Sequence, residues 1–229
     1  MPSIHYAWFI GLAGGSILLF LCYFFLSTFN YKKRFETQYD VRSYFPYEFN
    51  FESKLTDNIL GNAALILSMV FSMGLFALGL AYFKTNGYLV ASIIAGILYS
   101  ILVLGINFTP LKLLRFHFVV MVLLFAASFF TPMAVGLTSF NIYQGTKNPF
   151  VLALMIACFV VGLVMFVFIM NPRLSFNIKM QVAVDENGNE KLIRPKFIPV
   201  AFTEWLMILL LPINQILFTL LIIALAVNG

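Results

Sequence analysis

Residues 149–171 read PFVLALMIACFVVGLVMFVFIMN, an almost wholly apolar run without a charged side chain. A helix of about 20 apolar residues is long enough to cross the hydrocarbon core of a bilayer, which is about 30 Å thick. Further runs of this kind cover residues 6–29, 58–83, 87–108, 114–138 and 200–227. The sequence therefore predicts an all-α membrane protein, built as a bundle of six transmembrane helices.

The composition of the whole chain agrees with this prediction. Of its 229 residues 62% are hydrophobic and 10% are charged, whereas an ordinary soluble domain is about 45–50% apolar and about 25% charged. A soluble fold could not bury so much apolar surface. We expect a single transmembrane domain over residues 1–229, with its two longer loops at 30–57 and 172–199.

The basic residues predict the orientation of the helices. An even number of crossings puts loops 30–57, 109–115 and 172–199 on one side, and 12 of the 14 Lys and Arg lie there. They are Lys32, Lys33, Arg34, Arg42, Lys54, Lys112, Arg115, Arg173, Lys179, Lys191, Arg194 and Lys196. Because Lys and Arg resist translocation, we expect these loops in the cytoplasm and both termini on the non-cytoplasmic side of the plasma membrane.

The net charge of +5 follows from this topology and favours contact with membrane lipids that carry anionic headgroups. Nucleic acid binding would need a basic folded module, and the sequence contains none. Cys22 and Cys158 lie in apolar runs with no partner at metal or disulfide spacing. We expect no metal site and no cofactor.

The loop 172–199 carries the pattern of a β-hairpin. Residues 179–184 alternate polar and apolar, residues 185–190 include an Asn-Gly turn, and residues 191–194 return before Pro195. We therefore predict a short cytoplasmic β-hairpin between the fifth and sixth helices. A lone hairpin is marginal in water, so it should rest on another loop, on headgroups or on a protein partner. The alternative is a solvated connector.

The loop 30–57 interleaves aromatic and charged residues over residues 39–51. Tyr and Phe at headgroup depth are common interfacial anchors. The alternative is a lid that covers a site.

Polar residues are sparse inside the apolar runs. No ionisable residue lies in the middle of a predicted helix, which argues against an ion pump, a voltage sensor or a proton-driven transporter. The deepest polar side chains are Asn62, Asn214 and Gln215, and such amides commonly hydrogen-bond between helices. Pro212 removes a backbone donor and predicts a kink. A helix break at Pro212 to Gln215 could serve a small-molecule transporter or channel subunit.

One group of residues could support catalysis at the predicted cytoplasmic edge. His117 lies near the start of the fourth helix, Asp57 precedes the second, and Glu204 is in the first turns of the sixth. A His beside a carboxylate can act as a general base, so these three are the catalytic candidates. Acidic residues that open helices are also ordinary capping groups, and no HExxH or GxSxG motif accompanies them. We favour a non-catalytic protein.

The same edge is a candidate site for lipid headgroups. Lys112, Arg115 and His117 lie at headgroup depth beside a helix N-terminus, which carries a partial positive charge. We predict that these three residues bind an anionic headgroup. The alternative is that Lys112 and Arg115 snorkel to separate lipids.

Small residues at four-residue spacing predict close helix packing. Gly11 and Gly15 lie in the first helix, and Ser92, Gly96 and Ser100 lie in the third. Such faces let backbones approach within a bundle.

The chain contains several short motifs at the ends of its predicted helices. They are Phe45-Pro46-Tyr47, Leu55-Thr56-Asp57-Asn58 with Gly61-Asn62, Gly105 with Thr109-Pro110 and His117, and Arg194-Pro195 with Trp205. In these motifs the chain resembles the six-pass DRAM/Frag/Sfk-like family and related bacterial membrane proteins of unknown function. Asn58 follows Asp57 where the family has a Ser-Asp-x-Gly-like sequence. The resemblance implies a six-helix fold and a role in lipid organisation or remodelling.

Three functional classes remain open. We favour a protein that binds lipid headgroups or a partner membrane complex. The alternatives are a transporter or channel subunit and an interfacial lipid-modifying enzyme around His117. An open pocket in which His117 reaches Asp57 or Glu204 would favour the enzyme.

Overall fold

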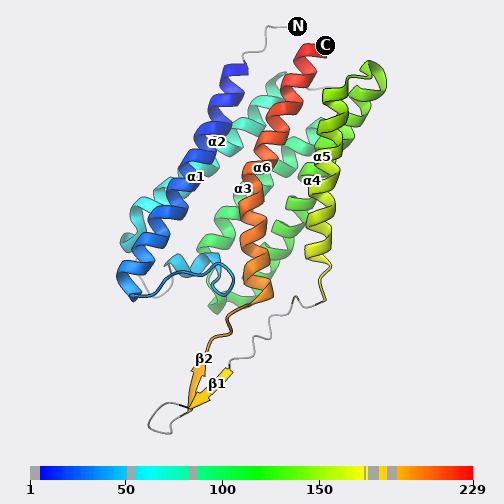
Figure 1. The fold of residues 1–229 in the computed structure, drawn as a ribbon. Helices are drawn as coiled ribbons and strands as arrows, with labels where there is room; N and C mark the ends of the chain where they lie inside the picture. The colour runs from blue at the N-terminus through cyan, green and yellow to red at the C-terminus, as the bar shows by residue number, and fades with distance from the viewer. Residues whose placement is uncertain are drawn as a thin grey trace.

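The structure, a computed structural model, describes residues 6–50, 55–82, 87–172, 174, 181–184 and 190–228. Within these residues six helices are long and apolar enough to cross a membrane. They are α1 (Tyr6–Phe35), α2 (Ile59–Tyr82), α3 (Gly87–Phe108), α4 (Leu114–Thr146), α5 (Pro149–Ile169) and α6 (Pro199–Asn228). The chain is a multi-pass membrane protein, as its sequence predicts, and its helices form one bundle (Figure 1).

The helices follow a simple path through the bundle. Each of α1 to α5 packs against the next one in the chain, and α6 contacts all five of them. The start of α1 and the end of α6 lie at the same end of the bundle (Figure 1). Three short 3-10 helices, η1 (Pro46–Asn50), η2 (Leu55–Asn58) and η3 (Leu111–Leu113), belong to the connections at the opposite end.

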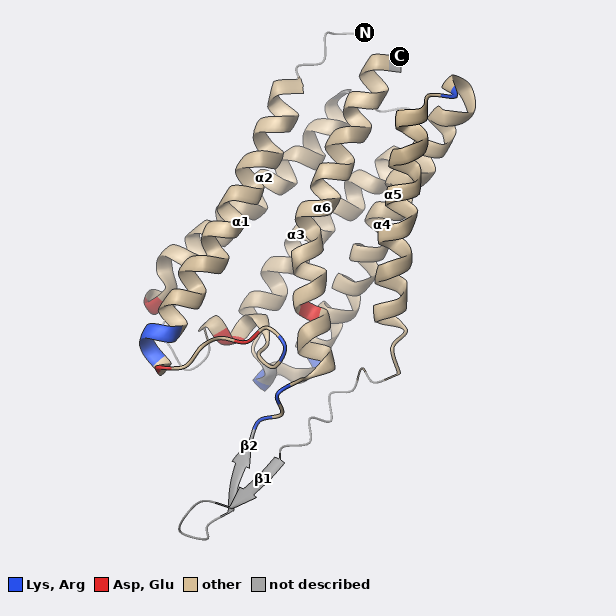
Figure 2. Ribbon diagram, in the orientation of Figure 1, with Lys and Arg blue, Asp and Glu red and all other residues tan. Residues whose placement is uncertain are grey.

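That opposite end, where α1 ends and α4 and α6 begin, carries most of the charged residues that the structure describes (Figure 2). We call it the basic end. The outer surface between the two ends is apolar, with Phe25, Phe29, Phe116 and Phe130 each at least 59% exposed. Water disfavours so much exposed apolar surface, whereas hydrocarbon does not.

Two helices are longer than their apolar runs. α1 continues through Lys32, Lys33 and Arg34 to Phe35, where cations interact favourably with the helix C-terminus. α4 continues to Thr146 and ends at Lys147, which is left-handed with φ 52° and donates its N–H to the Tyr143 carbonyl at 2.8 Å. Hydropathy marks only the apolar part of a helix, whereas the backbone stays helical until a capping residue such as Lys147 ends it. The apolar runs therefore give helices that are too short.

Two glycines allow α1 and α3 to pack closely against α2. A Cβ at Gly96 would overlap the ring of Phe76, which is fully buried. Gly11 has nothing within 4 Å of that position, whereas Gly15 would meet the ring of Phe71 at 2.8 Å. The predicted small-residue faces therefore contribute close packing at Gly96 and Gly15 and none at Gly11.

The predicted cytoplasmic β-hairpin needs correction. Two four-residue strands, β1 (Gln181–Val184) and β2 (Glu190–Ile193), pair antiparallel with Val182 opposite Leu192. The pair projects beyond the helix ends and packs on no other described element (Figure 1). Of the predicted turn at 185–190, residues 185–189 lie outside the described residues. A two-stranded hairpin with nothing packed against it is only marginally stable in water. The folded unit is therefore all-helical, and a hairpin resting on loops or headgroups is not supported.

The helix break that the transporter alternative requires is not seen in α6. α6 is continuous from Pro199 to Asn228, with Pro212 inside it. Tyr99 of α3 donates its hydroxyl to the Met207 carbonyl, and Asn214 donates to the Leu210 carbonyl at 3.1 Å. Pro212 has no N–H to donate to the carbonyl four residues before it, and these two donors bond to carbonyls near that position. Neighbouring side chains commonly accommodate a proline in a membrane helix in this way.

Candidate functional site

His117 of α4 and Glu204 of α6 lie in contact at the basic end of the bundle. Nε2 of His117 is 3.1 Å from Oε1 of Glu204, and neither side chain has any exposed surface. α4 begins at Leu114 and α6 at Pro199, so both residues lie within the first two turns of their helices. The packing of α4 against α6 brings the two residues together.

The second ring nitrogen of His117 defines the proton arrangement. Nδ1 lies 2.7 Å from the carbonyl oxygen of Thr109. Because a carbonyl only accepts, Nδ1 must carry a hydrogen. Nε2 can then face Glu204 either as an imidazolium donor to a carboxylate or as a neutral acceptor from a protonated carboxyl. In both cases His117 and Glu204 hold one proton between them.

The turn between α3 and α4 supplies the Thr109 carbonyl. α3 ends at Phe108, and Pro110 has an extended backbone with φ −73° and ψ 154°. The residue before a proline is disfavoured in a helix, so Thr109 leaves the helix and its carbonyl is free of the helical ladder. His117 occupies that carbonyl and thereby holds the turn against α4.

Glu204 has one polar atom without a partner. Oε2 makes no hydrogen bond to any described residue, although it is buried. An unmade hydrogen bond of this kind costs about 1–3 kcal/mol, and such groups often occur where a protein binds or reacts with something. This pair is therefore the candidate site of the fold.

Two aromatic rings close the site. The rings of Phe45 and Tyr47, from the loop between α1 and α2, lie nearly perpendicular to the His117 ring, with centroid distances of 6.3 Å and 5.6 Å. Both rings are buried. We use the name aromatic cap for Tyr39, Tyr44, Phe45, Tyr47 and Phe49 together. Part of the aromatic loop thus packs into the protein and covers the pair.

An ion pair ties the aromatic cap to the segment before α6. Arg194 donates to both carboxylate oxygens of Glu48, at 2.7 Å and 3.0 Å. Glu48 also accepts from the backbone N–H of Phe45 at 2.5 Å, and the Arg194 guanidinium lies over the Tyr44 ring at 4.5 Å. This geometry is the bidentate form, which is stronger than a single charged hydrogen bond.

Trp205 fixes the other side of the aromatic cap. Its indole N–H is shared between the Tyr39 hydroxyl and the Tyr44 carbonyl, each at 3.0 Å. The Tyr39 hydroxyl donates in turn to the Phe45 carbonyl at 2.7 Å. Burial raises the pKa of Tyr39 well above its usual value, so this hydroxyl keeps its proton. The aromatic cap is held by hydrogen bonds on two sides.

The other catalytic candidate, Asp57, lies apart from His117. It makes a long ion pair with Arg34, 3.8 Å between charged atoms, and is 44% exposed. α2 packs against α1 and α3 but not against α4. The structure therefore joins His117 with Glu204 and leaves Asp57 out.

Of the predicted headgroup ligands, Lys112 and Arg115 are exposed at the basic end, while His117 is buried beneath the aromatic cap. Asn62 donates to the Asn50 side chain at 2.9 Å, which links α2 to the 30–57 loop.

The intramembrane amides on α6 differ from each other. Gln215 donates to the hydroxyls of Ser16 on α1 and Ser72 on α2, at 2.9 Å and 2.8 Å. Asn214 bonds to the Leu210 carbonyl of its own helix. Both are 1% exposed, and neither amide oxygen has a partner among the described residues. The Gln215 bonds connect three helices.

Sequence reasoning missed three features of this region. They are the Arg194 to Glu48 pair, the Trp205 to Tyr39 bond and the serine hydroxyls around Gln215. The signals were weak, because an Arg and a Glu in two loops 146 positions apart carry no shared pattern. Serines spaced four apart, at 68 and 72 on α2, were the one available hint of a polar helix face.

Comparison of the chain with family models, curated proteins and solved structures finds no match.

Proposed function

We propose that the chain is a non-catalytic membrane protein that binds an anionic lipid headgroup at the turn between α3 and α4. Arg115 carries this proposal, because it is exposed at the basic end and makes no ion pair with any other described residue. Lys112 is exposed three residues earlier. A guanidinium at headgroup depth favours a phosphate group over a neutral one.

His117 supports this site indirectly. Its bond to the Thr109 carbonyl fixes the turn that carries Lys112 and Arg115. In the proposed site His117 is thus a positioning residue, and the two cations are the groups that meet the lipid.

Native mass spectrometry of the purified protein tests the proposal. The variant with Lys112→Gln and Arg115→Gln should retain about tenfold less phosphatidylglycerol than the wild type, as expected for the loss of charge-assisted hydrogen bonds. Retention of phosphatidylcholine should not change. Lys147→Gln, at the opposite end of α4, is the matched control. Equal retention of phosphatidylglycerol by the double variant and the control would contradict the proposal.

An interfacial lipid-modifying enzyme is the second candidate. The proton held between His117 and Glu204, together with the unpartnered Oε2 atom, favours it. Against it, both side chains are wholly buried beneath Phe45 and Tyr47, so a substrate would need the aromatic cap to open. Glycerophospholipid turnover by the purified protein, lost in Glu204→Gln, would support this candidate.

The transporter alternative loses its main support, since α6 is continuous through Pro212 and Gln215 bonds to serines of α1 and α2. The protein partner expected at the 172–199 loop and the family resemblance stay predictions.

A further inference from the structure

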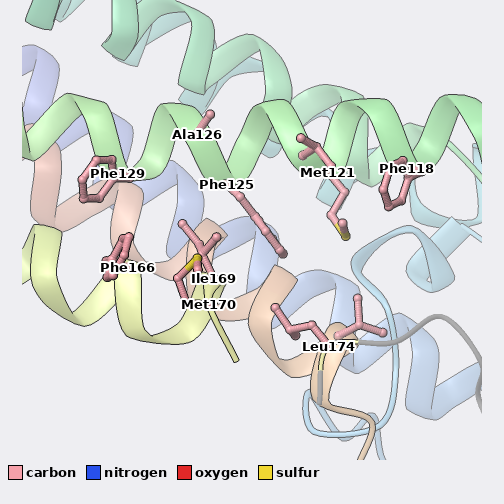
Figure 3. Close-up of a pocket in the computed structure, with 11 residues that line it drawn as sticks. Phe118, Met121, Phe125, Ala126, Phe129, Phe166, Ile169, Met170 and Leu174 are labelled. Atoms are coloured by element: carbon pink, nitrogen blue, oxygen red, sulfur yellow. The ribbon is translucent and has the colours of Figure 1, made fainter. Parts of the chain in front are cut away.

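A groove runs along the outside of α4 at the basic end. It has a volume of about 490 Å³. Its walls come from α4, the end of α5 and the start of α6 (Figure 3). The lining side chains are Phe118, Met121, Val122, Phe125, Ala126, Phe129, Phe166, Ile169, Met170, Leu174 and Val200. None of them is polar.

The floor of the groove is built from well-packed residues. Met121, Phe125 and Val200 are at most 6% exposed, whereas Val122 and Met170 on its rim are 45% and 63% exposed. The groove is thus a crevice between helices that opens sideways from the bundle. In a protein whose helices span the bilayer, that opening faces hydrocarbon.

We propose that this groove holds one acyl chain of a membrane lipid whose anionic headgroup lies on Arg115. The inference rests on the proposed function and adds the place of the lipid tail. Arg115 precedes Phe118 by three residues on α4, which puts both on the same helix face. Helical side chains lean toward the N-terminus, so the guanidinium lies beyond the end of the groove, toward the headgroup layer.

The position of Arg115 favours an acyl chain as the occupant of the groove. From Phe118 to Phe129 the groove follows α4 for about 16 Å, at 1.5 Å per residue. Its lining side chains are all apolar, and the exposed Arg115 lies at its headgroup end. A lipid can therefore fill the groove with an acyl chain and place its own anionic headgroup on the guanidinium, where the opposite charges attract.

Photochemical crosslinking in nanodiscs tests the inference. The nanodiscs contain phosphatidylcholine and a phosphatidylglycerol that carries a diazirine in its acyl chain. Crosslinked peptides should concentrate on Met121, Phe125, Phe166 and Met170. Crosslinks spread evenly over all exposed helix faces would overturn the inference. So would a concentration on Phe25 and Phe29, which line a second hollow beside Lys32.

Two valines of α4 provide matched variants. Val122 lines the groove, whereas Val119 is 50% exposed and lies outside it. Val122→Trp should reduce groove crosslinking severalfold, and Val119→Trp should leave it unchanged. Ala126→Phe fills the groove from another position and should also reduce groove crosslinking severalfold. This second variant keeps the test valid if Val122→Trp fails to fold. Equal crosslinking in all of them would overturn the inference.

A further experiment tests the acyl-chain groove and the headgroup site independently of each other. The preference is the ratio of groove crosslinking by phosphatidylglycerol to that by a phosphatidylcholine with the same photoreactive chain. Arg115→Gln should lower this ratio about tenfold. Groove crosslinks that are equal for the two lipids and unaffected by Arg115→Gln would support the acyl-chain groove and contradict the proposed function. An effect of Arg115→Gln without any effect of Val122→Trp would overturn the groove and leave the proposed function standing.

Discussion

Nε2 of His117 lies 3.1 Å from Oε1 of Glu204 in a site with no exposed surface. The contact joins the first turns of α4 and α6 and sits directly beneath Phe45 and Tyr47. Buried polar pairs of this kind are costly when one partner is lost. The pair therefore links the stability of the bundle to the position of the α3 to α4 turn, where we propose that lipid binds.

Removal of one partner should destabilise the protein strongly. Glu204→Ala should lower the free energy of unfolding by about 3 kcal/mol, because it leaves a buried His117 nitrogen unpaired. Unfolding in mixed detergent micelles measures this change. Asp57→Ala, at an exposed ion pair, should cost less than about 1 kcal/mol.

A double-mutant cycle gives the sharper test of the pair. The variant with His117→Leu and Glu204→Leu should be clearly less destabilised than the sum of the two single variants, since neither partner is then left alone. Additive effects would show that the two side chains do not interact.

The two neighbouring amides of α6 should respond differently to substitution. Gln215→Leu should lower stability by about 1 kcal/mol, because two interhelical hydrogen bonds of about 0.6 kcal/mol each are lost. Asn214→Leu should have a smaller effect, because Asn214 bonds to its own helix. The same unfolding assay compares them, and a larger loss for Asn214→Leu would refute this assignment.

The Arg194 to Glu48 pair should hold the aromatic cap closed. Arg194→Gln removes the bidentate contact and should speed hydrogen exchange of the backbone over residues 45–49 by about tenfold. Arg42→Gln is the control, because Arg42 pairs through its side chain with Asp40 at the surface. Equal protection in the two variants would mean that the ion pair does not secure the aromatic cap.

Close packing at Gly96 should be sensitive to a single methyl group. Gly96→Ala should destabilise the bundle by about 1–3 kcal/mol, because the added carbon overlaps the buried Phe76 ring. Gly11→Ala adds the same group in open space and should be neutral. A neutral Gly96→Ala would show that α2 and α3 can separate at little cost.

The sequence predicted the parts of the fold that depend on hydropathy alone. The six helices follow from the length of the apolar runs, because each run must satisfy its backbone within the bilayer. The ends of α1 and α4 were predicted too short, since a helix ends at a cap such as Lys147 and not where the hydropathy falls. The predicted hairpin was wrong as part of the folded unit, because alternation over four residues does not show what the strands pack against.

The candidate site was predicted only in part. His117 and Glu204 were both named, but pairwise contact depends on how α4 and α6 pack, and no pattern in one sequence encodes this. For the same reason Asp57 looked equivalent to Glu204, although α2 lies away from α4. The sequence likewise does not decide whether the aromatic loop anchors to the interface or covers a site, because the burial of this loop over His117 depends on Arg194 and Trp205.

Every proposal about lipid depends on the basic end of the bundle facing the cytoplasm, where anionic lipids are common. Cysteine labelling of intact cells tests this directly, with Cys22 and Cys158 first replaced by Ala. A cysteine at exposed Thr37, beside the end of α1, should react with an impermeant maleimide only after the cells are opened. A cysteine at exposed Gly145, at the other end of the bundle, should react from outside. The reverse pattern, with Thr37→Cys labelled in intact cells and Gly145→Cys protected, would contradict the orientation.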